Sequence, residues 1–409
     1  MRKVLVIGGG AAGLIAAGAA ARRGYDVTVL ERNQRPARKV MITGKGRCNL
    51  TNYCTSVPEL IANVPTNGRF LYGAFSRFMP ADMMTLIEDM GVPLKIERGN
   101  RVFPVSDKAV DIVDALVRYA KSGGARIVQG RAASFQMTDG CVNAVQCADG
   151  KIFSADAFIL ATGGKSYPLT GSVGDGYRLA QQAGHMVIPP HPSLVPFVLA
   201  GEDYKALQGV SLKNIAIAIK DAHSGKTVYE DFGEMLFTHF GVSGPVILSA
   251  SAAVKDVHTR TYTLSIDLKP ALDEETLDKR ILRELEENRM KTLTSVVLTL
   301  VPHALVPLIL KRANIPGDAK AHAVTKKMRT ALIKTLKSLD FTITGTRSFD
   351  EAIVTSGGIS VKDIDPKTMR SKICDNLFFA GEVIDVDAFT GGFNLQIAFS
   401  TGMCAGNNV

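Results

Sequence analysis

Short aliphatic runs and alanine- or glycine-rich stretches alternate at the start of the chain. Residues 3–7 (KVLVI) are β-branched or aliphatic after the first lysine, a pattern typical of a strand buried on both faces. The alanine-rich stretch that follows predicts a helix to Arg23, with Gly24 as its C-terminal cap. Residues 26–31 (DVTVLE) predict a second strand. The three elements form a βαβ unit within about 30 residues.

The next segment combines two helices with a β-rich stretch. Helical periodicity covers 79–90 and about 107–122, where Gly123-Gly124 ends the second helix. Residues 126–148 alternate in the manner of a strand toward an Asp149-Gly150 turn. Residues 151–160 then predict a hairpin partner that runs into a buried strand, AFIL.

The pattern changes at Pro189-Pro190-His191-Pro192, where three prolines in four residues exclude a helix and predict a crossover into a separate unit. After the crossover we expect strands at 212–220 and 261–268, a helical block at 273–339 and strand signals at 341–354. The chain ends in a strand (LFFAGE), a glycine-rich turn and a helix. The outer segments thus enclose an inserted module.

We therefore predict an α/β fold in which a Rossmann-like nucleotide-binding domain holds an inserted mixed β and helical domain. The predicted segments are 1–190, 191–355 and 356–409, the first and last forming one domain. Within the insertion, 191–270 and 341–355 are expected to be β-rich and 273–339 helical.

Composition narrows the class of protein. The 409 residues are 46% hydrophobic and 21% charged, which excludes disorder and coiled coil. A net charge of +9 invites a nucleic-acid partner, but no RNA- or DNA-binding motif accompanies it. Tryptophan is absent and aromatic residues make up only 7%, which leaves few stacking platforms for bases. We expect no nucleic-acid partner.

Cysteine usage and hydropathy indicate a cytoplasmic protein. The six cysteines form no C-x-x-C pair and have no histidine at metal-ligand spacing, so we expect no metal site and a reducing compartment. The uncharged stretch 293–310 is interrupted by Pro302 and Pro307 and has His303 at its centre. It predicts buried helices rather than a membrane span.

Glycines in the first βαβ unit carry the strongest chemical signal. Gly8, Gly10 and Gly13 match G-x-G-x-x-G between a strand and a helix. This motif allows a tight turn, a close approach of backbone to pyrophosphate and close helix packing. Glu31 ends the second strand 18 residues after Gly13, where it can accept hydrogen bonds from ribose hydroxyls. The sequence therefore predicts dinucleotide binding, without choosing between NAD and FAD.

Three further clusters bear on that choice. Residues 43–52 (TGKGRCNLTN) form a loop too rich in glycine and polar side chains for a core. Residues 161–164 (ATGG) follow a buried strand and precede the glycines of 171–176. Residues 381–382 (Gly-Glu) precede 391–396 (GGFNLQ) and a closing helix.

With these clusters the chain resembles, nearly end to end, the BaiN/aminoacetone-oxidase-type family of FAD-dependent oxidoreductases, in the glutathione-reductase-like group. One departure is Lys45, where family members often carry glycine, which puts in doubt how closely the loop approaches the cofactor there. The matches run in order through the fingerprint, GRCNLTN (46–52), ATGG (161–164), GDGY (174–177), GEMLFTHFGVSGP (233–245), TSGGI (355–359), TMRSK (368–372) and GEVIDVDAFTGGFNLQIAFSTG (381–402).

The resemblance implies FAD, with the GRCN loop along the flavin and Glu382 near the ribityl or pyrophosphate. Independently, backbone N–H groups of 392–394 at a helix N-terminus can stabilise the negative charge of reduced flavin. The candidate FAD-binding residues are Gly8, Gly10, Ala12, Gly13, Glu31, Arg32, Lys39, Gly46, Arg47, Cys48, Asn49, Ala161, Thr162, Gly163, Gly164, Asp175, Gly381, Glu382, Gly392, Phe393, Asn394 and Leu395.

Two residues are candidates for catalysis. His239, inside the GEMLFTHFGVSGP stretch, is a candidate for proton transfer because histidine titrates near neutral pH; a purely structural role is an equal alternative. Asp385 and Asp387 lie at i and i+2, so in an extended segment they would point the same way, to orient substrate or to satisfy backbone donors.

The leading functional hypothesis is hydride transfer between a small organic substrate and FAD. The resemblance offers NAD(P)H-dependent reduction of a conjugated C=C, as in enone-like bile acids, or oxidation of a small amine such as aminoacetone by O2. The Gly-Asp-Gly turn is similar to that of fumarate-reductase and ketosteroid-dehydrogenase flavoproteins, which favours C=C reduction. No second glycine fingerprint is present, so any NAD(P)H would bind transiently or not at all. An RNA-associated flavoprotein is a less favoured alternative, and a monomer or homodimer is expected.

Overall fold

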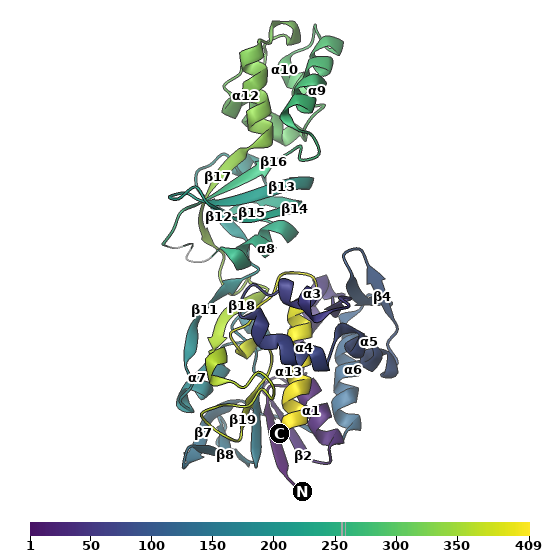
Figure 1. Ribbon diagram of the computed structural model, residues 1–409, viewed down its shortest axis with the longest axis vertical. Helices are drawn as coiled ribbons and strands as arrows, with labels where there is room; N and C mark the ends of the chain where they lie inside the picture. The colour runs from purple at the N-terminus through teal and green to yellow at the C-terminus, as the bar shows by residue number, and fades with distance from the viewer. Residues whose placement is uncertain (255–256, 258) are drawn as a thin grey trace. The chain divides into compact units, whose positions relative to one another are not determined.

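A computed structural model describes residues 1–254, 257 and 259–409. The chain divides into two compact units, Met1–Ser193 with Ser348–Val409, and Leu194–Arg347. We call them unit 1 and unit 2 (Figure 1).

Unit 1 is built on a five-stranded parallel sheet in the order β19-β10-β1-β2-β6. Its strands are nearly continuous aliphatic and aromatic runs because helices cover the sheet, as parallel sheets require. The strand bounds are β1 (Lys3–Ile7), β2 (Asp26–Glu31), β6 (Arg126–Gln129), β10 (Ala157–Leu160) and β19 (Leu377–Phe379).

Smaller elements complete unit 1. The remaining strands of unit 1 form three small antiparallel sheets, β3-β5-β4, β7-β8-β9 and β11-β18. Their bounds are β3 (Thr51–Asn52), β4 (Leu94–Glu97), β5 (Arg101–Pro104), β7 (Ala132–Thr138), β8 (Cys141–Cys147), β9 (Ile152–Ser154), β11 (Val187–Ser193) and β18 (Val354–Ile359). The helices are α1 (Ala11–Arg22), α2 (Arg38–Ile42), α3 (Val57–Ala62), α4 (Tyr72–Arg77), α5 (Pro80–Asp89), α6 (Ala109–Ser122), α7 (Asp175–Gln182) and α13 (Phe393–Asn408).

Unit 2 contains a closed six-stranded antiparallel barrel in the order β12-β15-β14-β13-β16-β17, with a helical cluster inserted between β16 and β17. The strands are β12 (Phe197–Leu199), β13 (Ser211–Asp221), β14 (Thr227–Thr238), β15 (Gly241–Ser243), β16 (Tyr262–Asp267) and β17 (Leu339–Thr346). Helix α8 (Pro245–Ala253) packs on β14. The helical cluster comprises α9 (Glu274–Glu287), α10 (Leu293–Val297), α11 (Val306–Ala313) and α12 (Lys326–Lys337).

The inserted segment differs from the predicted 191–355 at both ends. The proline-rich residues 189–192 belong to β11, which pairs with β18 across a register shift between Ile188 and His191. Because these two strands pair with each other, both stay in unit 1 and the insertion narrows to Leu194–Arg347. The predicted strand 341–354 is correspondingly two strands, β17 and the start of β18. The sequence analysis also missed β14, a strand of 12 residues.

Helices α1 and α13 run parallel in close contact at the centre of unit 1 (Figure 1). A Cβ atom added to Gly402 would lie 2.4 Å from the carbonyl oxygen of Ala12, and one on Gly406 would lie 2.4 Å from that of Ala16. Both contacts advance by four residues, so the two helices point the same way. Glycine at these positions therefore sets the distance between the helices.

This packing predicts that Gly402→Ala destabilises the protein. The added methyl group meets backbone that cannot move aside, so the expected cost of about 1–3 kcal/mol exceeds the gain in helix propensity. The free energy of unfolding, measured by urea denaturation, checks this. Asn407→Ala on the exposed side of the same helix is the control and should change it by less than about 0.5 kcal/mol. Equal stability of both variants would contradict the proposed contact.

Candidate functional site

The N-terminus of α1 has the features of an anion site. Gly8 has φ +104°, and a Cβ on it would lie 2.5 Å from the carbonyl oxygen of Ala161, which follows β10. A Cβ on Gly13 would lie 1.9 Å from the carbonyl oxygen of Gly8. At Gly10, in contrast, nothing lies within 4 Å of an added Cβ. The first turn of α1 contains no acidic residue and its N-cap makes no side-chain hydrogen bond, so its free N–H groups are not capped by a side chain.

Glu31, at the end of β2, lies directly beside this turn. One carboxylate oxygen accepts a hydrogen bond from the backbone N–H of Gly9 at 2.7 Å, and the other accepts two from Asn33 at 2.8 Å. The residue is only 7% exposed. These bonds fix the carboxylate at the carboxyl edge of the sheet, where a ribose is expected.

Arg32 and Asp175 belong to one ion network at the start of α7. Asp175 pairs with Arg131 at 2.8 Å and with Arg32 at 3.4 Å, and Arg32 also donates to the carbonyl oxygen of Gly171 at 3.2 Å. The hydrogen bonds from Arg131 hold the pKa of Asp175 below its ordinary value. The predicted cofactor residues Arg32 and Asp175 are therefore linked to each other through this network.

A second uncapped helix start lies at α13. Gly391 and Gly392 have φ +123° and +102°, and the first turn of α13 contains no acidic residue. A Cβ on Gly392 would lie 2.4 Å from the carbonyl carbon of Thr51, so the GRCN loop passes directly against this helix start. Thr51 also donates to Gln396 at 2.7 Å. The structure thus brings the 43–52 and 391–396 clusters together.

Within that second cluster, the Asn394 side chain bonds to its own loop. Its Oδ1 accepts from the N–H of Ala388 at 2.9 Å, and its Nδ2 donates to the carbonyl oxygen of Ala388 at 2.7 Å. These bonds shape the turn that leads into α13. Phe393 is buried, whereas Leu395 is partly exposed, so at this helix start the backbone is the better candidate for ligand contact than the Asn394 amide.

The two helix starts are offset along their common direction. Gly402, which faces Ala12, is nine residues into α13, whereas Ala12 is one residue into α1. At 1.5 Å per residue, the start of α13 lies about 12 Å beyond the start of α1. An extended dinucleotide such as FAD has its pyrophosphate and its flavin ring joined by a ribityl chain of about this reach. The parallel helices can therefore present N–H groups to both parts of one cofactor.

Glu382 is the centre of a polar network between the two helix starts. Its carboxylate pairs with Lys39 at 2.8 Å and accepts hydrogen bonds from Ser166 at 2.9 Å and from the backbone N–H of Thr355 at 2.8 Å. A Cβ on Gly164 would lie 2.4 Å from the Thr355 hydroxyl oxygen, so ATGG and TSGGI meet here. Sequence reasoning missed Ser166 and gave Thr355 no role, although TSGGI was visible as a motif.

The predicted loop residues Arg47 and Cys48 have internal partners. Arg47 forms ion pairs with Glu97 and Asp107 and lies over the ring of Phe103 at 4.2 Å. Cys48 is fully buried, and burial raises the pKa of its thiol to about 12. The thiol therefore stays protonated at neutral pH, which excludes a reactive thiolate. The Arg47 side chain holds the loop, and its backbone N–H bonds to the carbonyl oxygen of Gly44 at 3.3 Å.

Buried polar atoms without partners lie in two of the predicted cofactor segments. Asn49 Oδ1, in the GRCN loop, and Thr162 Oγ1, beside Gly163 at the end of β10, have no hydrogen-bond partner among the described residues. Buried polar groups are normally satisfied, so such atoms favour a missing ligand. With the open space at Gly10 and Gly46, they make the chain a good fit for FAD.

The candidate catalytic residues fall in different units. Asp385, in unit 1, accepts a hydrogen bond from Asn67 at 2.9 Å, and neighbouring Asp387 accepts from Ser193 and Ser356. His239, in unit 2, lies in the turn between β14 and β15, is exposed and contacts the ring of Phe240. Asp387 is thus structurally engaged, and the roles of the other two stay predictions.

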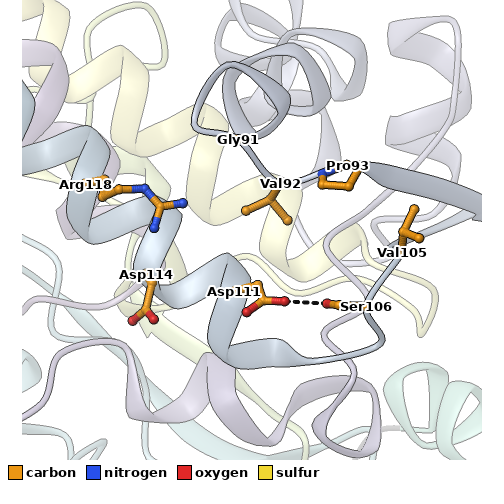
Figure 2. Close-up of a pocket in the computed structure, with 8 residues that line it drawn as sticks. All are labelled: Gly91, Val92, Pro93, Val105, Ser106, Asp111, Asp114 and Arg118. Atoms are coloured by element: carbon orange, nitrogen blue, oxygen red, sulfur yellow. Dashed lines mark hydrogen bonds between the residues drawn. The ribbon is translucent and has the colours of Figure 1, made fainter.

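A separate hollow of about 400 Å³ lies between the start of α6 and the connection from α5 to β4 (Figure 2). Asp111 and Ser106 join across it by a 2.5 Å hydrogen bond, while Arg118 donates to the carbonyl oxygen of Met90 and Asp114 pairs with Arg35. None of the predicted cofactor residues lines it, so it is distinct from the FAD site.

Comparison with known proteins places the whole chain in one family. The model for the HI0933-like protein Rossmann domain matches residues 2–408. The chain belongs to this family. It is therefore an FAD-dependent oxidoreductase with a glutathione-reductase-like Rossmann fold and an inserted β-rich domain, which confirms the fold class and the cofactor-dependent class of enzyme expected from the motifs.

Two curated relatives span the chain. A 3-dehydro-bile acid delta(4,6)-reductase from Clostridium scindens is 30% identical and covers 99% of this chain and 98% of its own. A ribosomal RNA dihydrouridine synthase from Haemophilus influenzae is 31% identical and covers 97% of this chain and 96% of its own. Among solved structures, Mycobacterium smegmatis Sdh1 in complex with UQ1 aligns with TM-score 0.51 at 17% identity, covering 99% of this chain and 68% of its own, a likeness of fold.

No helix among the residues that the structure describes is both long and apolar enough to cross a membrane. The stretch 293–310 folds as α10, a single turn of 3-10 helix and part of α11, and most of its apolar side chains are buried in unit 2.

The geometry at α1 predicts that two glycine substitutions separate cofactor binding from folding. Gly10 has φ −81° and open space around it, so Gly10→Ala should fold normally but place a methyl group where the pyrophosphate approaches. We expect the affinity for FAD to fall tenfold or more, a loss of about 1.4 kcal/mol in binding free energy. Flavin absorbance after gel filtration measures occupancy, and circular dichroism measures folding.

Gly13→Ala is the matched comparison. Its methyl group meets the carbonyl oxygen of Gly8, so this variant should lose folded protein as well as FAD. Full flavin occupancy in Gly10→Ala would contradict the placement of the pyrophosphate.

Proposed function

We propose that this protein uses NAD(P)H and FAD to reduce a carbon–carbon double bond conjugated to a carbonyl group. The observation that carries the proposal is the reaction shared by its two relatives. One is named as a bile-acid delta(4,6)-reductase and the other as a dihydrouridine synthase. Dihydrouridine is uridine with its 5,6 double bond saturated, and that bond is also conjugated to a carbonyl. Two different substrates thus share one reactive group.

The reaction balances with NAD(P)H as the reductant. NAD(P)H gives up a hydride, the carbon β to the carbonyl gains it, and the carbon α to the carbonyl gains a proton. The glycine turn at α1 and the N–H groups at the start of α13 would hold FAD, which would supply a hydride carrier between the nicotinamide and the substrate. The chain shows no second glycine fingerprint, which fits a nicotinamide that binds transiently.

The residues of the chain contribute orientation and charge stabilisation. The N–H groups at the start of α13 lie against the GRCN loop, so they can stabilise negative charge on a ring held there. The Lys39–Glu382 pair, tied down by Ser166 and Thr355, fixes the segment before α13. The Cys48 thiol is neutral and buried, so it supplies no redox step.

Asp385 and His239 are the two candidates for proton delivery. The Asp385 carboxylate already accepts a hydrogen bond from Asn67 in the same unit, which suits it to a positioning role. His239 is exposed, and an imidazole can both give and take a proton, so we propose it as the proton donor to the carbon α to the carbonyl.

Anaerobic stopped-flow absorbance in the flavin band, near 450 nm, tests the proposal. We expect NADH or NADPH to bleach the flavin, and an added enone to restore the colour faster than O2 does. The His239→Ala variant should keep the bleaching step and slow the recovery by about 10²–10⁴-fold. Flavin that is bleached only by a primary amine and reoxidised rapidly by O2, with peroxide formed, would replace the reductase with an amine oxidase.

A further inference from the structure

The charges of the helical cluster in unit 2 are strongly segregated along the sequence. Residues 273–288 contain seven acidic and three basic side chains, whereas residues 289–337 contain ten basic and one acidic. The excess of nine in this second segment equals the net charge of the whole chain. The segment that contains α10, α11 and α12 is therefore one of two strongly basic parts of the chain; the other is residues 1–50, with ten basic and two acidic side chains.

Half of these basic side chains are paired within unit 2. Arg329 pairs with Asp278 on α9, and Lys337 pairs with Asp267 at the end of β16. Lys311 and Arg312 both pair with Asp203, and Arg289 pairs with Glu286. These five basic side chains therefore take part in ion pairs that hold unit 2 together.

The other half are exposed lysines that make no ion pair with any residue in the described ranges. We call them the basic face: Lys291, Lys320, Lys326, Lys327 and Lys334. Lys320 donates to the carbonyl oxygen of Met290 at 3.2 Å, which leaves its charge unneutralised.

Backbone contacts bring the lysines of the basic face together. The N–H of Ala321 bonds to the carbonyl oxygen of Lys291 at 3.0 Å, and a β-bridge joins Thr292 to Lys320. The chain then enters α12 through Thr325, whose side chain caps the helix. Lys291 and Lys320 thus lie on neighbouring segments just before α12.

On α12 itself the three lysines share one side. At 100° per residue, Lys326, Lys327 and Lys334 fall within about 100° of the helix circumference. Leu332 and Leu336, both fully buried, occupy the opposite side. From Lys326 to Lys334 the helix rises about 12 Å. The side chains therefore form an extended positive surface instead of a single point charge.

The position of two of these lysines has a cost for folding. Lys326 and Lys327 lie in the first turn of α12, where the helix dipole disfavours positive charge. No acidic residue is present in that turn to offset them. A helix that served only to pack would be more stable with neutral or acidic residues there, so the charges point to a partner.

The composition of the segment indicates the kind of partner. Residues 289–337 contain no Phe, Tyr or Trp, so they offer no platform for stacking unpaired bases and no aromatic anchor for a lipid surface. Lysines contact phosphate groups without reading the sequence of bases. A regular phosphate backbone, as in base-paired RNA, matches this surface better than single strands or membranes.

We propose that the basic face of the helical cluster binds the phosphate backbone of base-paired RNA and so holds an RNA substrate to the enzyme. The scarcity of aromatic residues argues against stacking on unpaired bases but not against contact with a phosphate backbone. Only one part of this inference rests on the proposed reductase function: the group that would be reduced in the bound RNA, a uracil ring. The surface itself is tested without turnover.

The experiment measures binding of a fluorescein-labelled RNA hairpin to the oxidised holoenzyme by anisotropy over a range of salt concentrations. The variant carries Lys326→Gln, Lys327→Gln and Lys334→Gln. Glutamine keeps helix propensity, and removal of charge from the first turn should leave the melting temperature equal or slightly higher. We expect affinity to fall tenfold or more and the slope of log K against log salt to decrease by about 3.

The matched control removes the same charge elsewhere in unit 2, with Lys213→Gln, Lys220→Gln and Lys226→Gln on β13 and the turn after it. All three lysines are exposed, and this variant should bind the hairpin as the parent does. Equal losses in both variants, no hairpin binding by the parent, or lysine-dependent binding to phosphatidylserine vesicles but not to the hairpin would each overturn the proposal.

The two proposals can fail separately. Lysine-dependent hairpin binding with no flavin-linked enone or uracil reduction would leave the surface standing and reject the reductase. Reduction of a small enone with equal hairpin affinity in both triple variants would leave the reductase standing and reject the surface.

Discussion

The parallel contact between α1 and α13 is the constraint on which the rest of the candidate site depends. Gly402 and Gly406 let the backbone of α13 approach Ala12 and Ala16. Because this contact fixes both distance and direction, the two uncapped helix starts face the same side with an offset of about 12 Å. A ligand with two electron-rich parts at that separation can use both helix dipoles, and FAD is such a ligand.

The remaining features of unit 1 serve to hold that arrangement. Glu31 is anchored by Gly9 and Asn33 beside the first helix start, and Thr51 is packed on Gly392 at the second. The ion network of Arg47 restrains the loop that passes the second start. Most polar side chains named as cofactor contacts therefore also shape the backbone around the ligand, which places backbone N–H groups foremost in binding.

Local patterns in the sequence could predict the parts of the protein whose structure is local. The β1–α1–β2 unit was predicted almost to the residue because its strand, glycine turn and helix lie within 31 positions. Strand β14 was missed because Val228, Phe232 and Leu236 are apolar yet exposed, which breaks the usual alternation. The closed barrel and the Glu382 network join segments far apart in sequence, as with Ser166, which no spacing rule reveals.

Binding calorimetry on the apoprotein tests the shared use of two helix starts most directly. FAD, ADP and FMN are titrated separately, because ADP can reach only the start of α1 and FMN only that of α13. We expect FAD to bind at least a hundredfold more tightly than either fragment, a difference of about 2.7 kcal/mol in binding free energy. ADP or FMN binding as tightly as FAD would show that one helix start suffices and would contradict the account.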